Sequence, residues 1–384
     1  MEIKLPPRLA VNGNGETKCV VFARDFYAAK RALSPYCSGV IRSYPFISAF
    51  GATVNVHDVD DLSRMPAVRA IAAHTTVTAC GEQIPVLTEQ DHAEIKSAAR
   101  GVLGLRAFAN ERTRKSRGNG EGITIAVIDT GVCAHPDFMM PRVRIKKFVD
   151  LIGGKALPYD DNGHGSAVAG IACGNGLVSG GEYRGSAPKA DLVAIKALGK
   201  NGEGSAFDIL EAMQWIYINH REYNIKVVCM SFGTAPLEEN DPLAAGAEAL
   251  WQEGVTVVAS AGNSGPSNGS VTSPAIAPDV IAVGAYGEEN GKYYVPDFSS
   301  RGYGDLVKPE VVALGVDVVC PYPQNFYVKM SGTSMAAPAV AGLCAGLFVA
   351  EPKATPDRIK EIVADSAEKM IGYENASGYG IVRT

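Results

Sequence analysis

Three short motifs place an aspartate, a histidine and a serine where they could activate a hydroxyl group for nucleophilic attack. Asp129 ends the apolar run IAVID, His164 lies between glycines in NGHGSAVAG, and Ser334 precedes a helix-like run in SGTSMAAPAVAG. A serine hydroxyl is a weak nucleophile until a base accepts its proton, and an imidazole that titrates near neutrality suits this task. A buried carboxylate on the other ring nitrogen fixes the tautomer. The motifs therefore predict acyl transfer on Ser334, with His164 as base and Asp129 as its orienting carboxylate.

The same chemistry calls for donors that stabilise an oxyanion. Asn263 follows the apolar run VTVVAS in SAGNSGP, so its side-chain amide could point into the same cleft. The backbone N–H of Ser334, at the start of a helix, would be a second donor. His135 in CAHPDF is close to Asp129 in sequence. Because the base must approach the carboxylate from across the cleft, we interpret His135 as a structural histidine in a turn.

The elements that must position these residues begin at Gly122. From there, apolar runs of strand length alternate with helix-period segments, which predicts right-handed βαβ crossovers and an α/β fold with a parallel sheet covered by helices on both faces. Sites in such sheets gather at the carboxyl ends of the strands. The predicted strands are 123–129, 191–198, 226–233, 255–262 and 279–286, and the predicted helices are 166–174, 205–221, 242–254, 334–350 and 355–370.

A second, smaller unit is predicted ahead of this sheet. Its segments alternate as β-α-β-β-α-β, the ferredoxin-like α+β order, with a single last strand over 68–79. A polar and charged stretch follows it. We therefore divide the chain into a ferredoxin-like unit over 1–80, a linker and start of the main unit over 81–120, and the α/β unit over 121–384.

Composition excludes several classes of function. The net charge of −5 and the absence of a basic stretch argue against nucleic-acid binding, and no uninterrupted run of about 18 apolar residues predicts a membrane span. The first residues, MEIKLPPRLAVNG, lack the apolar core of a secretory signal, so we expect a cytoplasmic protein, or a secreted one whose leader has been removed. The eight cysteines fall largely in apolar runs, which favours free thiols over four disulfides.

The blocks IDTGV, NGHG, SAGNSGP and GTSMAAP, in the chain order Asp, His, Asn, Ser, resemble the four signature blocks of the subtilisin family of serine proteases. The resemblance spans about residues 120 to 384. YDDNGHG and GGEYRGSAP make the match most similar to the AprX-like branch. The family resemblance implies a serine endopeptidase that acts on proteins or peptides through an acyl-enzyme on Ser334, and it requires no cofactor for the chemistry.

The resemblance also assigns further residues. It implies that the small N-terminal unit is an inhibitory prodomain whose tail, about His74–Cys80, lies in the cleft like a substrate, with cleavage after Ala79 or Cys80. It implies that Asp137 occupies a calcium-ligand position, although the loop GNGLVSGGEYRG has few carboxylates to complete a shell of six to eight oxygens. The substrate-binding residues that it implies are Gly202, Gly204, Ser231, Phe232, Gly233, Ser260, Ala261, Gly262 and Thr272.

Two alternatives and several minor interpretations remain at this point. The family usually has a second histidine where this chain has Ala167, which leaves open a pseudoprotease that binds a partner through the same cleft. A permanently self-inhibited regulator is the other alternative. We interpret Asp160 and Asp161 as solvated loop acids, and Cys133 and Cys173 as inert thiols rather than a redox switch.

Overall fold

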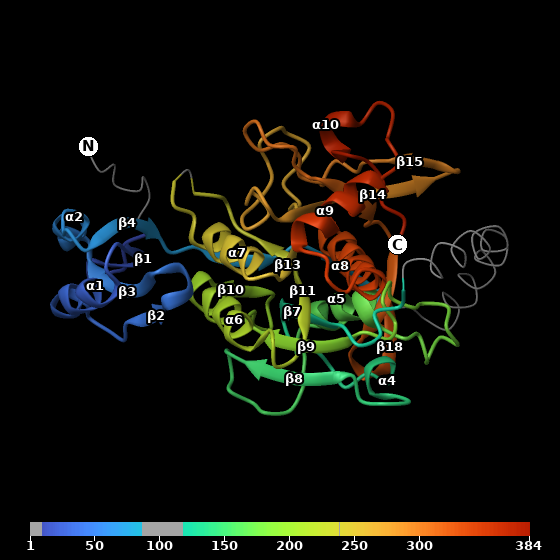
Figure 1. Cartoon of the computed structure of the whole chain (residues 1–384), viewed down its shortest axis with the longest axis horizontal. Helices are drawn as coiled ribbons and strands as arrows, with labels where there is room; N and C mark the ends of the chain where they lie inside the picture. Colours follow the sequence, from blue (N-terminus) through green and yellow to red (C-terminus); the bar gives the residue numbers. More distant parts are fainter. Residues whose placement is uncertain (1–9, 87–117, 238) are drawn as a thin grey trace.

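A small α+β unit and a large α/β unit lie side by side in the computed structural model (Figure 1). The structure describes residues 10–86, 118–237 and 239–384. Most of the predicted linker over 81–120 therefore lies outside the described residues.

The large unit is built on an eight-stranded, mostly parallel sheet, as predicted. The strand order is β15-β14-β13-β11-β7-β9-β8, with β16 also pairing with β14 and with only β15 antiparallel to its neighbour. The central strand β7 is buried at every residue. The strands are β7 (Thr124–Asp129), β8 (Ile145–Asp150), β9 (Asp191–Lys196), β11 (Ile225–Met230), β13 (Thr256–Ser260), β14 (Ile281–Glu289), β15 (Lys292–Tyr294) and β16 (Val311–Leu314).

Two pairs of helices cover the sheet. Helices α5 (His164–Cys173) and α8 (Thr333–Ala350) pack together on one face, and α6 (Ala206–Asn219) and α7 (Pro242–Gln252) pack together on the other. Helix α9 (Pro356–Asp365) contacts α8 and β13, and the short helices are α4 (Pro136–Met139) and α10 (Glu374–Ser377). The five helices predicted in this unit are all present.

Helix α8 departs from the expectation that no segment has the character of a membrane span. It is the one helix among the described residues that is long and apolar enough for such a span, yet 89% of it is buried inside the fold. A helix surrounded by protein on every side is as apolar as one surrounded by lipid. Its apolar composition therefore reflects its place in the core of the large unit.

The small unit has the predicted ferredoxin-like β-α-β-β-α-β order. Its four-stranded sheet has the order β2-β3-β1-β4. Asp25 caps the first helix by accepting a hydrogen bond from the backbone N–H of Ala28. The elements are β1 (Glu16–Ala23), α1 (Phe26–Leu33), β2 (Arg42–Tyr44), β3 (Ala49–Asn55), α2 (Val59–Ser63) and β4 (Val68–Ala73), with 3₁₀ turns at Ser34–Tyr36, Pro45–Ile47 and Val56–Asp58.

The period-two alternation of β1 explains how this sheet joins the large unit. Cys19 and Val21 point to the face covered by α1 and α2 and belong to a core of their own. Val20 and Phe22 point the other way and share the main hydrophobic core of the large unit. Neighbouring side chains of a strand face opposite sides, so one sheet connects two cores.

Three elements differ from the sequence-based expectation. The single last strand over 68–79 is two strands, because β4 stays in the small sheet whereas β5 (Thr76–Ala79) pairs with the large unit. Strand β8 was not predicted, since its exposed lysines interrupt the apolar pattern at the edge of the sheet. Residues of the expected linker form β6 (Glu82–Val86), which pairs with β18 (Phe326–Ser331) of the hairpin that begins with β17 (Val318–Tyr322).

Candidate active site

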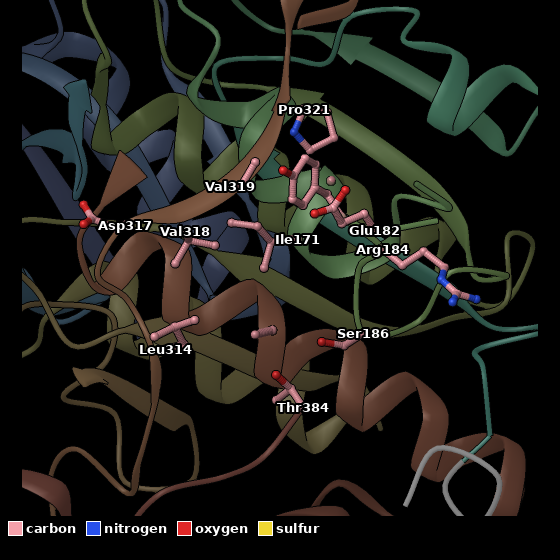
Figure 2. A pocket seen from close by; sticks show the side chains of 13 residues that line it. Ile171, Glu182, Arg184, Ser186, Leu314, Asp317, Val318, Val319, Pro321 and Thr384 are labelled. Atoms are coloured by element: carbon pink, nitrogen blue, oxygen red, sulfur yellow. The ribbon is translucent and has the colours of Figure 1, made fainter. Parts of the chain in front are cut away.

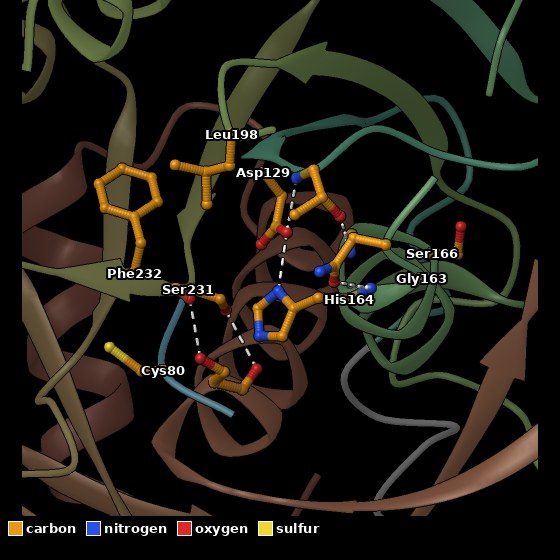
Figure 3. Close-up of polar contacts among 12 residues, drawn as sticks. Cys80, Asp129, Gly163, His164, Ser166, Leu198, Ser231 and Phe232 are labelled. Atoms are coloured by element: carbon orange, nitrogen blue, oxygen red, sulfur yellow. Dashed lines mark hydrogen bonds and ion pairs between the residues drawn. The ribbon is translucent and has the colours of Figure 1, made fainter. Parts of the chain in front are cut away.

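Asp129 and His164 form a buried hydrogen-bonded pair at the carboxyl end of β7. Asp129 is the last residue of that strand, and His164 is the first residue of α5. His164 Nδ1 lies 2.7 Å from Asp129 Oδ1, and Asp129 also accepts a hydrogen bond from the Thr130 N–H (Figure 3). Burial alone would lower the pKa of His164, but the charge of Asp129 and the hydrogen bond to it outweigh burial and raise the pKa. The pair is therefore arranged to stabilise an imidazolium.

Ser334 lies in the same cleft, one residue into α8, but its hydroxyl is turned away from the histidine. Ser334 Oγ donates a hydrogen bond to the Ser231 carbonyl oxygen at 2.8 Å, whereas His164 Nε2 has no hydrogen-bond partner among the described residues. The expected continuous chain from carboxylate to hydroxyl is thus only half formed. Gly81 lies beside the ring, since a methyl group added to Gly81 would lie 3.1 Å from His164 Nε2.

The carbonyl group of Cys80 occupies the position expected for an oxyanion. Asn263 Nδ2 donates to the Cys80 carbonyl oxygen at 2.9 Å, and the backbone N–H of Ser334 donates to it at 3.2 Å. These are the two donors named from the sequence. Donors at this distance from a carbonyl oxygen are placed to stabilise the negative charge that forms when its carbon is attacked.

Thr333 orients the side chain of Asn263 and was missed by the sequence reasoning. Its backbone N–H and its hydroxyl both donate to Asn263 Oδ1, at 3.0 and 2.9 Å. Because both hydrogen bonds require an oxygen at that position, the Nδ2 donor of Asn263 must face Cys80. The signal was present in the motif GTS, directly before the serine.

The chain segment before Cys80 runs through the cleft as an added strand. Strand β5 pairs antiparallel with β10 (Glu203–Ser205) on one side and with β12 (Phe232–Gly233) on the other. The Ala79 N–H donates to the Gly202 carbonyl oxygen at 2.9 Å, and the Cys80 N–H donates to the Ser231 carbonyl oxygen at 3.2 Å. Gly204 lies opposite Val77 in this register. The edge residues predicted to bind substrate are thus the ones that bind this segment.

The segment after Cys80 is also paired, which the sequence did not suggest. In the register of β6 with β18, Glu82 lies opposite Ser331 and Val86 lies opposite Val328. The chain therefore crosses the whole cleft, with Cys80 and Gly81 at its centre.

The remaining predicted residues surround the side chain of Cys80. Phe232 and Gly233 form one wall, Ser260, Ala261 and Gly262 form the facing wall, and Thr272 lies between them. The Thr272 N–H and hydroxyl both donate to the Ala261 carbonyl oxygen, at 2.9 and 3.2 Å. The residues that pair with or contact residues 76–80 are Gly202, Gly204, Ser231, Phe232 and Gly233, and Thr272 joins Gly233 to Ala261 and Gly262.

The interpretation of Asp160 as a solvated acid is wrong. Its side chain is only 8% exposed. One carboxylate oxygen accepts from Thr130 Oγ1 and from the N–H groups of Asn162 and Gly163, and the other accepts from the N–H and the hydroxyl of Ser166. A carboxylate that satisfies so many donors on both sides of His164 fixes the loop that presents the imidazole.

Its neighbour Asp161 is half-exposed and binds a fully buried lysine. Lys196 Nζ lies 2.7 Å from Asp161 Oδ1 and also donates to the carbonyl oxygens of Thr130 and Leu198. The ammonium group thus has three acceptors, as a buried cation requires. It ties the end of β9 to the turn after Asp129.

Asp137 is buried, and its surroundings do not fit a calcium ion. One carboxylate oxygen accepts from the Val178 N–H at 3.1 Å, and the other accepts from the Tyr327 hydroxyl at 2.7 Å. Both carboxylate oxygens are therefore already hydrogen-bond acceptors. Across residues 10–86, 118–237 and 239–384, no group of three or more His, Cys, Asp or Glu side chains is placed to hold a metal.

His135 is a structural residue, as interpreted. It precedes α4, and its Nδ1 accepts a hydrogen bond from the Asp137 N–H at 3.1 Å. Burial lowers the pKa of His135. Ala167 is fully buried in α5, so the departure from the family pattern lies in the core and not in the cleft. All eight cysteines are free thiols, as their apolar surroundings suggested.

A cavity of about 340 Å³ lies between the carboxyl-terminal half of α5, β17 and α8 (Figure 2). Ile171, Val318 and Pro321 give it apolar walls, and Glu182 and Arg184 are at its rim. It contains none of the residues assigned to the site.

This fold and this cleft together define a class of protein. A parallel α/β sheet that presents a carboxylate, an imidazole and a serine hydroxyl at its carboxyl edge, with two donors around a carbonyl oxygen, is the arrangement of a serine hydrolase. The chain belongs to the subtilase family, since the Peptidase S8 model of that family matches residues 120–380.

Individual relatives agree with this family. Serine protease AprX of Bacillus subtilis (strain 168) is 39% identical over 279 residues, which cover 65% of this chain and 62% of AprX. Subtilisin of Bacillus sp. (strain TA39) is 37% identical over 294 residues, which cover 72% of this chain and 69% of that protein. The chain therefore spans about three fifths of AprX.

Solved structures give the same fold. The S41 psychrophilic protease has a TM-score of 0.61 and 34% identity, and the match covers 69% of this chain and 92% of that one. Fervidolysin from Fervidobacterium pennivorans, a keratinolytic enzyme related to subtilisin, has a TM-score of 0.73. At 21% identity the second match shows the fold alone, but it covers 98% of this chain and 61% of that one, and thus includes the small unit.

Proposed function

We propose that the chain is a serine endopeptidase whose first substrate is its own Cys80–Gly81 peptide bond. The observation that carries this proposal is the place of the Cys80 carbonyl oxygen, 2.9 Å from Asn263 Nδ2 and 3.2 Å from the Ser334 N–H. Gly81, on the other side of the bond, lies against His164. A peptide bond held in this way has its carbonyl activated and its leaving nitrogen next to a proton donor.

The reaction begins with a rotation of the Ser334 side chain from the Ser231 carbonyl oxygen toward His164. His164 Nε2 then accepts the hydroxyl proton while Ser334 Oγ bonds to the Cys80 carbonyl carbon. Asn263 and the Ser334 N–H stabilise the resulting oxyanion. His164 returns the proton to the Gly81 nitrogen as the C–N bond breaks, and water, deprotonated by the same imidazole, releases Cys80 as a carboxylate.

The small unit acts in this proposal as an inhibitory prodomain. Its sheet docks on α6 through an ion pair of 2.5 Å between Arg42 and Asp208 and a hydrogen bond from the buried Tyr44 hydroxyl to the Phe207 carbonyl oxygen. His74 Nε2 lies 2.8 Å from Ser205 Oγ at the entry to β5. These contacts keep residues 76–80 in the cleft, and they support a division into a prodomain over 1–80, a linker and protease start over 81–120 and a peptidase domain over 121–384.

The test is mass spectrometry of the purified full chain during incubation. Wild type is expected to yield a fragment ending at Cys80 and a new amino terminus at Gly81, whereas Ser334→Ala stays intact because it lacks the nucleophile. A wild-type chain that hydrolyses a small ester but is never cut between residues 75 and 100 would contradict self-processing.

Experiments on the same purified protein distinguish the proposed enzyme from two alternatives. A pseudoprotease would not react with a fluorophosphonate probe, whereas the proposed enzyme is labelled at Ser334. A permanently self-inhibited regulator would never yield a mature amino terminus, even with excess protein, and would not hydrolyse an added peptide. The enzyme acts on proteins or peptides, and nucleic acids and membranes have no part in the proposal.

Calcium and compartment belong to the proposal as well. We propose that hydrogen bonds to Asp137 from Tyr327 and Val178 take the place of a structural calcium ion there. We also propose a reducing, cytoplasmic compartment, supported by eight free cysteines, of which five are buried. The test of the compartment is to isolate the protein from its own cells, denature it without reductant and alkylate its thiols. A secreted form with disulfides would take up fewer than eight labels.

A further inference from the structure

We propose that Thr272 closes the pocket for the residue before the scissile bond and so restricts the enzyme to substrates with a small residue there, such as alanine, serine or cysteine. The inference rests on the proposed peptidase function and deepens it by naming a substrate class.

Each wall of this pocket contains a glycine, Gly233 or Gly262, that lies directly against the side chain of Thr272. A methyl group added to Gly233 would lie 2.3 Å from Thr272 Oγ1 and 2.8 Å from its Cβ. A methyl group added to Gly262, on the facing wall, would lie 2.7 Å from Oγ1 and 2.8 Å from Cγ2. The branched side chain of Thr272 therefore fills the gap between the two walls.

This floor is held in place by its neighbours. The N–H and the hydroxyl of Thr272 both donate to the Ala261 carbonyl oxygen, which fixes the rotamer. The next residue, Ser273, exchanges two backbone hydrogen bonds with Thr234, at 3.0 and 3.1 Å. A side chain whose hydroxyl is bonded to one wall, and whose backbone is held on both sides, does not move aside to admit a larger group.

The depth that remains can be bounded from the position of Cys80. Its Sγ lies 3.4 Å from the same point on Gly233 that lies 2.3 Å from Thr272 Oγ1, so the sum of these distances, 5.7 Å, is the greatest possible separation of the two atoms. Non-bonded heavy atoms touch at about 3.5–4.0 Å, which leaves at most about 2 Å of free depth. An aromatic ring extends further than this.

The chemistry of the pocket also favours a small, neutral side chain. The residues of its walls and floor, Ser231–Gly233, Ser260–Gly262 and Thr272, include no charged side chain. Burial raises the pKa of the Cys80 thiol to about 11, so the group is uncharged at neutral pH. A Lys or Glu side chain would lose its hydration there without gaining a counter-ion.

The test uses fluorogenic peptides built on the chain's own cleft sequence, Val-Thr-Ala-X, with X as Ala, Ser, Cys, Leu or Phe. For processed wild type, kcat/KM is expected to be at least about 100-fold higher for Ala than for Phe. In Thr272→Gly the ratio should fall at least about 10-fold, since the floor is removed. Thr272→Val is the matched control, because it keeps the branched shape, and it should retain the wild-type ranking.

A second test uses self-processing. Cys80→Phe should slow cleavage after residue 80, and Thr272→Gly combined with it should restore cleavage. Faster cleavage of the Phe peptide by wild type, or unslowed processing of Cys80→Phe, would overturn the inference while leaving the peptidase function intact. Failure of wild type to cleave any peptide would instead contradict the function itself, and with it the inference.

Discussion

Two buried histidine–aspartate pairs lie close together in this protein, and only one is arranged for chemistry. His164 and Asp129 share a hydrogen bond of 2.7 Å between Nδ1 and Oδ1, whereas the corresponding atoms of His135 and Asp137 are 3.7 Å apart. Both imidazoles have an Nε2 without a hydrogen-bond partner within the part of the chain that the structure describes. Residue type and burial therefore do not distinguish the pairs.

What distinguishes them is where each nitrogen faces. His135 Nδ1 accepts a hydrogen bond from the backbone, so it is unprotonated, and the Asp137 oxygens are taken by Tyr327 and Val178. His164 Nδ1 faces a carboxylate, and its other side faces Gly81. Accordingly, the pKa of His164 is raised and that of His135 is lowered. A histidine becomes a base through the acceptor behind it and the substrate in front of it.

The largest effect on kcat is expected when His164 is replaced, and almost none when His135 is replaced. His164→Ala should lower kcat by about 10⁴- to 10⁶-fold, because nothing else accepts the Ser334 proton. His135→Ala should change kcat of the folded enzyme by less than about 3-fold and lower the unfolding free energy by about 1–3 kcal/mol. Peptide hydrolysis and urea unfolding of both variants measure this. Equal losses of kcat would mean that the distinction between the pairs is wrong.

A smaller loss of kcat is expected when Asn263, which donates to the oxyanion, is replaced. Asn263→Ala removes one of the two donors to the oxyanion and should lower kcat by about 100- to 1,000-fold with little change in KM. Thr333→Val is the companion variant, since it deletes the hydroxyl donor to Asn263 but keeps the backbone one, and it should have a weaker effect. Steady-state kinetics on a good peptide substrate decide the matter. A rise in KM alone would show that Asn263 binds substrate without stabilising the transition state.

Much of this site could be predicted because each catalytic residue sits in a short motif at the end of a strand or the start of a helix. Asp129, His164, Asn263 and Ser334 were all assigned in this way. Asp160 was misjudged because two adjacent acids in a glycine-containing loop resemble a solvated turn, and only the fold brings Thr130 and Ser166 onto its carboxylate. Local sequence identifies reactive groups better than the groups that hold them.

The same limit applies to long-range pairing. Strand β6 was assigned to a linker because its partner β18 lies more than 200 residues further along the chain, and nothing local records that register. The hydrogen bond from Ser334 to the Ser231 carbonyl oxygen was also hidden, since that acceptor lies 103 residues earlier in the chain. The predicted alternation of strands and helices succeeded because a buried parallel sheet leaves a continuous apolar pattern.

The pH dependence of kcat/KM should also distinguish the His164–Asp129 pair from the His135–Asp137 pair. Only neutral His164 can accept a proton, and its pKa is raised above 6.5, so kcat/KM should rise with pH and fall about tenfold per unit below that pKa. Burial lowers the pKa of His135, and its Nδ1 faces the Asp137 N–H and not the cleft, so His135→Asn should leave the midpoint unchanged. Rates between pH 5 and 9 provide the test. A flat profile would remove His164 from the proposed role.

The smallest effects are expected at Asp137, where a calcium ion and a hydrogen-bond network predict different outcomes. Tyr327→Phe deletes one donor to a buried carboxylate and should lower the unfolding free energy by about 1.5–3 kcal/mol without a comparable change in kcat. EDTA should leave the Tm of wild type unchanged, because the Asp137 oxygens already accept from Tyr327 and Val178. Thermal unfolding with and without calcium measures both. If calcium raised the Tm of wild type and not that of Asp137→Asn, Asp137 would be a calcium ligand. The hydrogen bonds from Tyr327 and Val178 would then form only when the ion is absent.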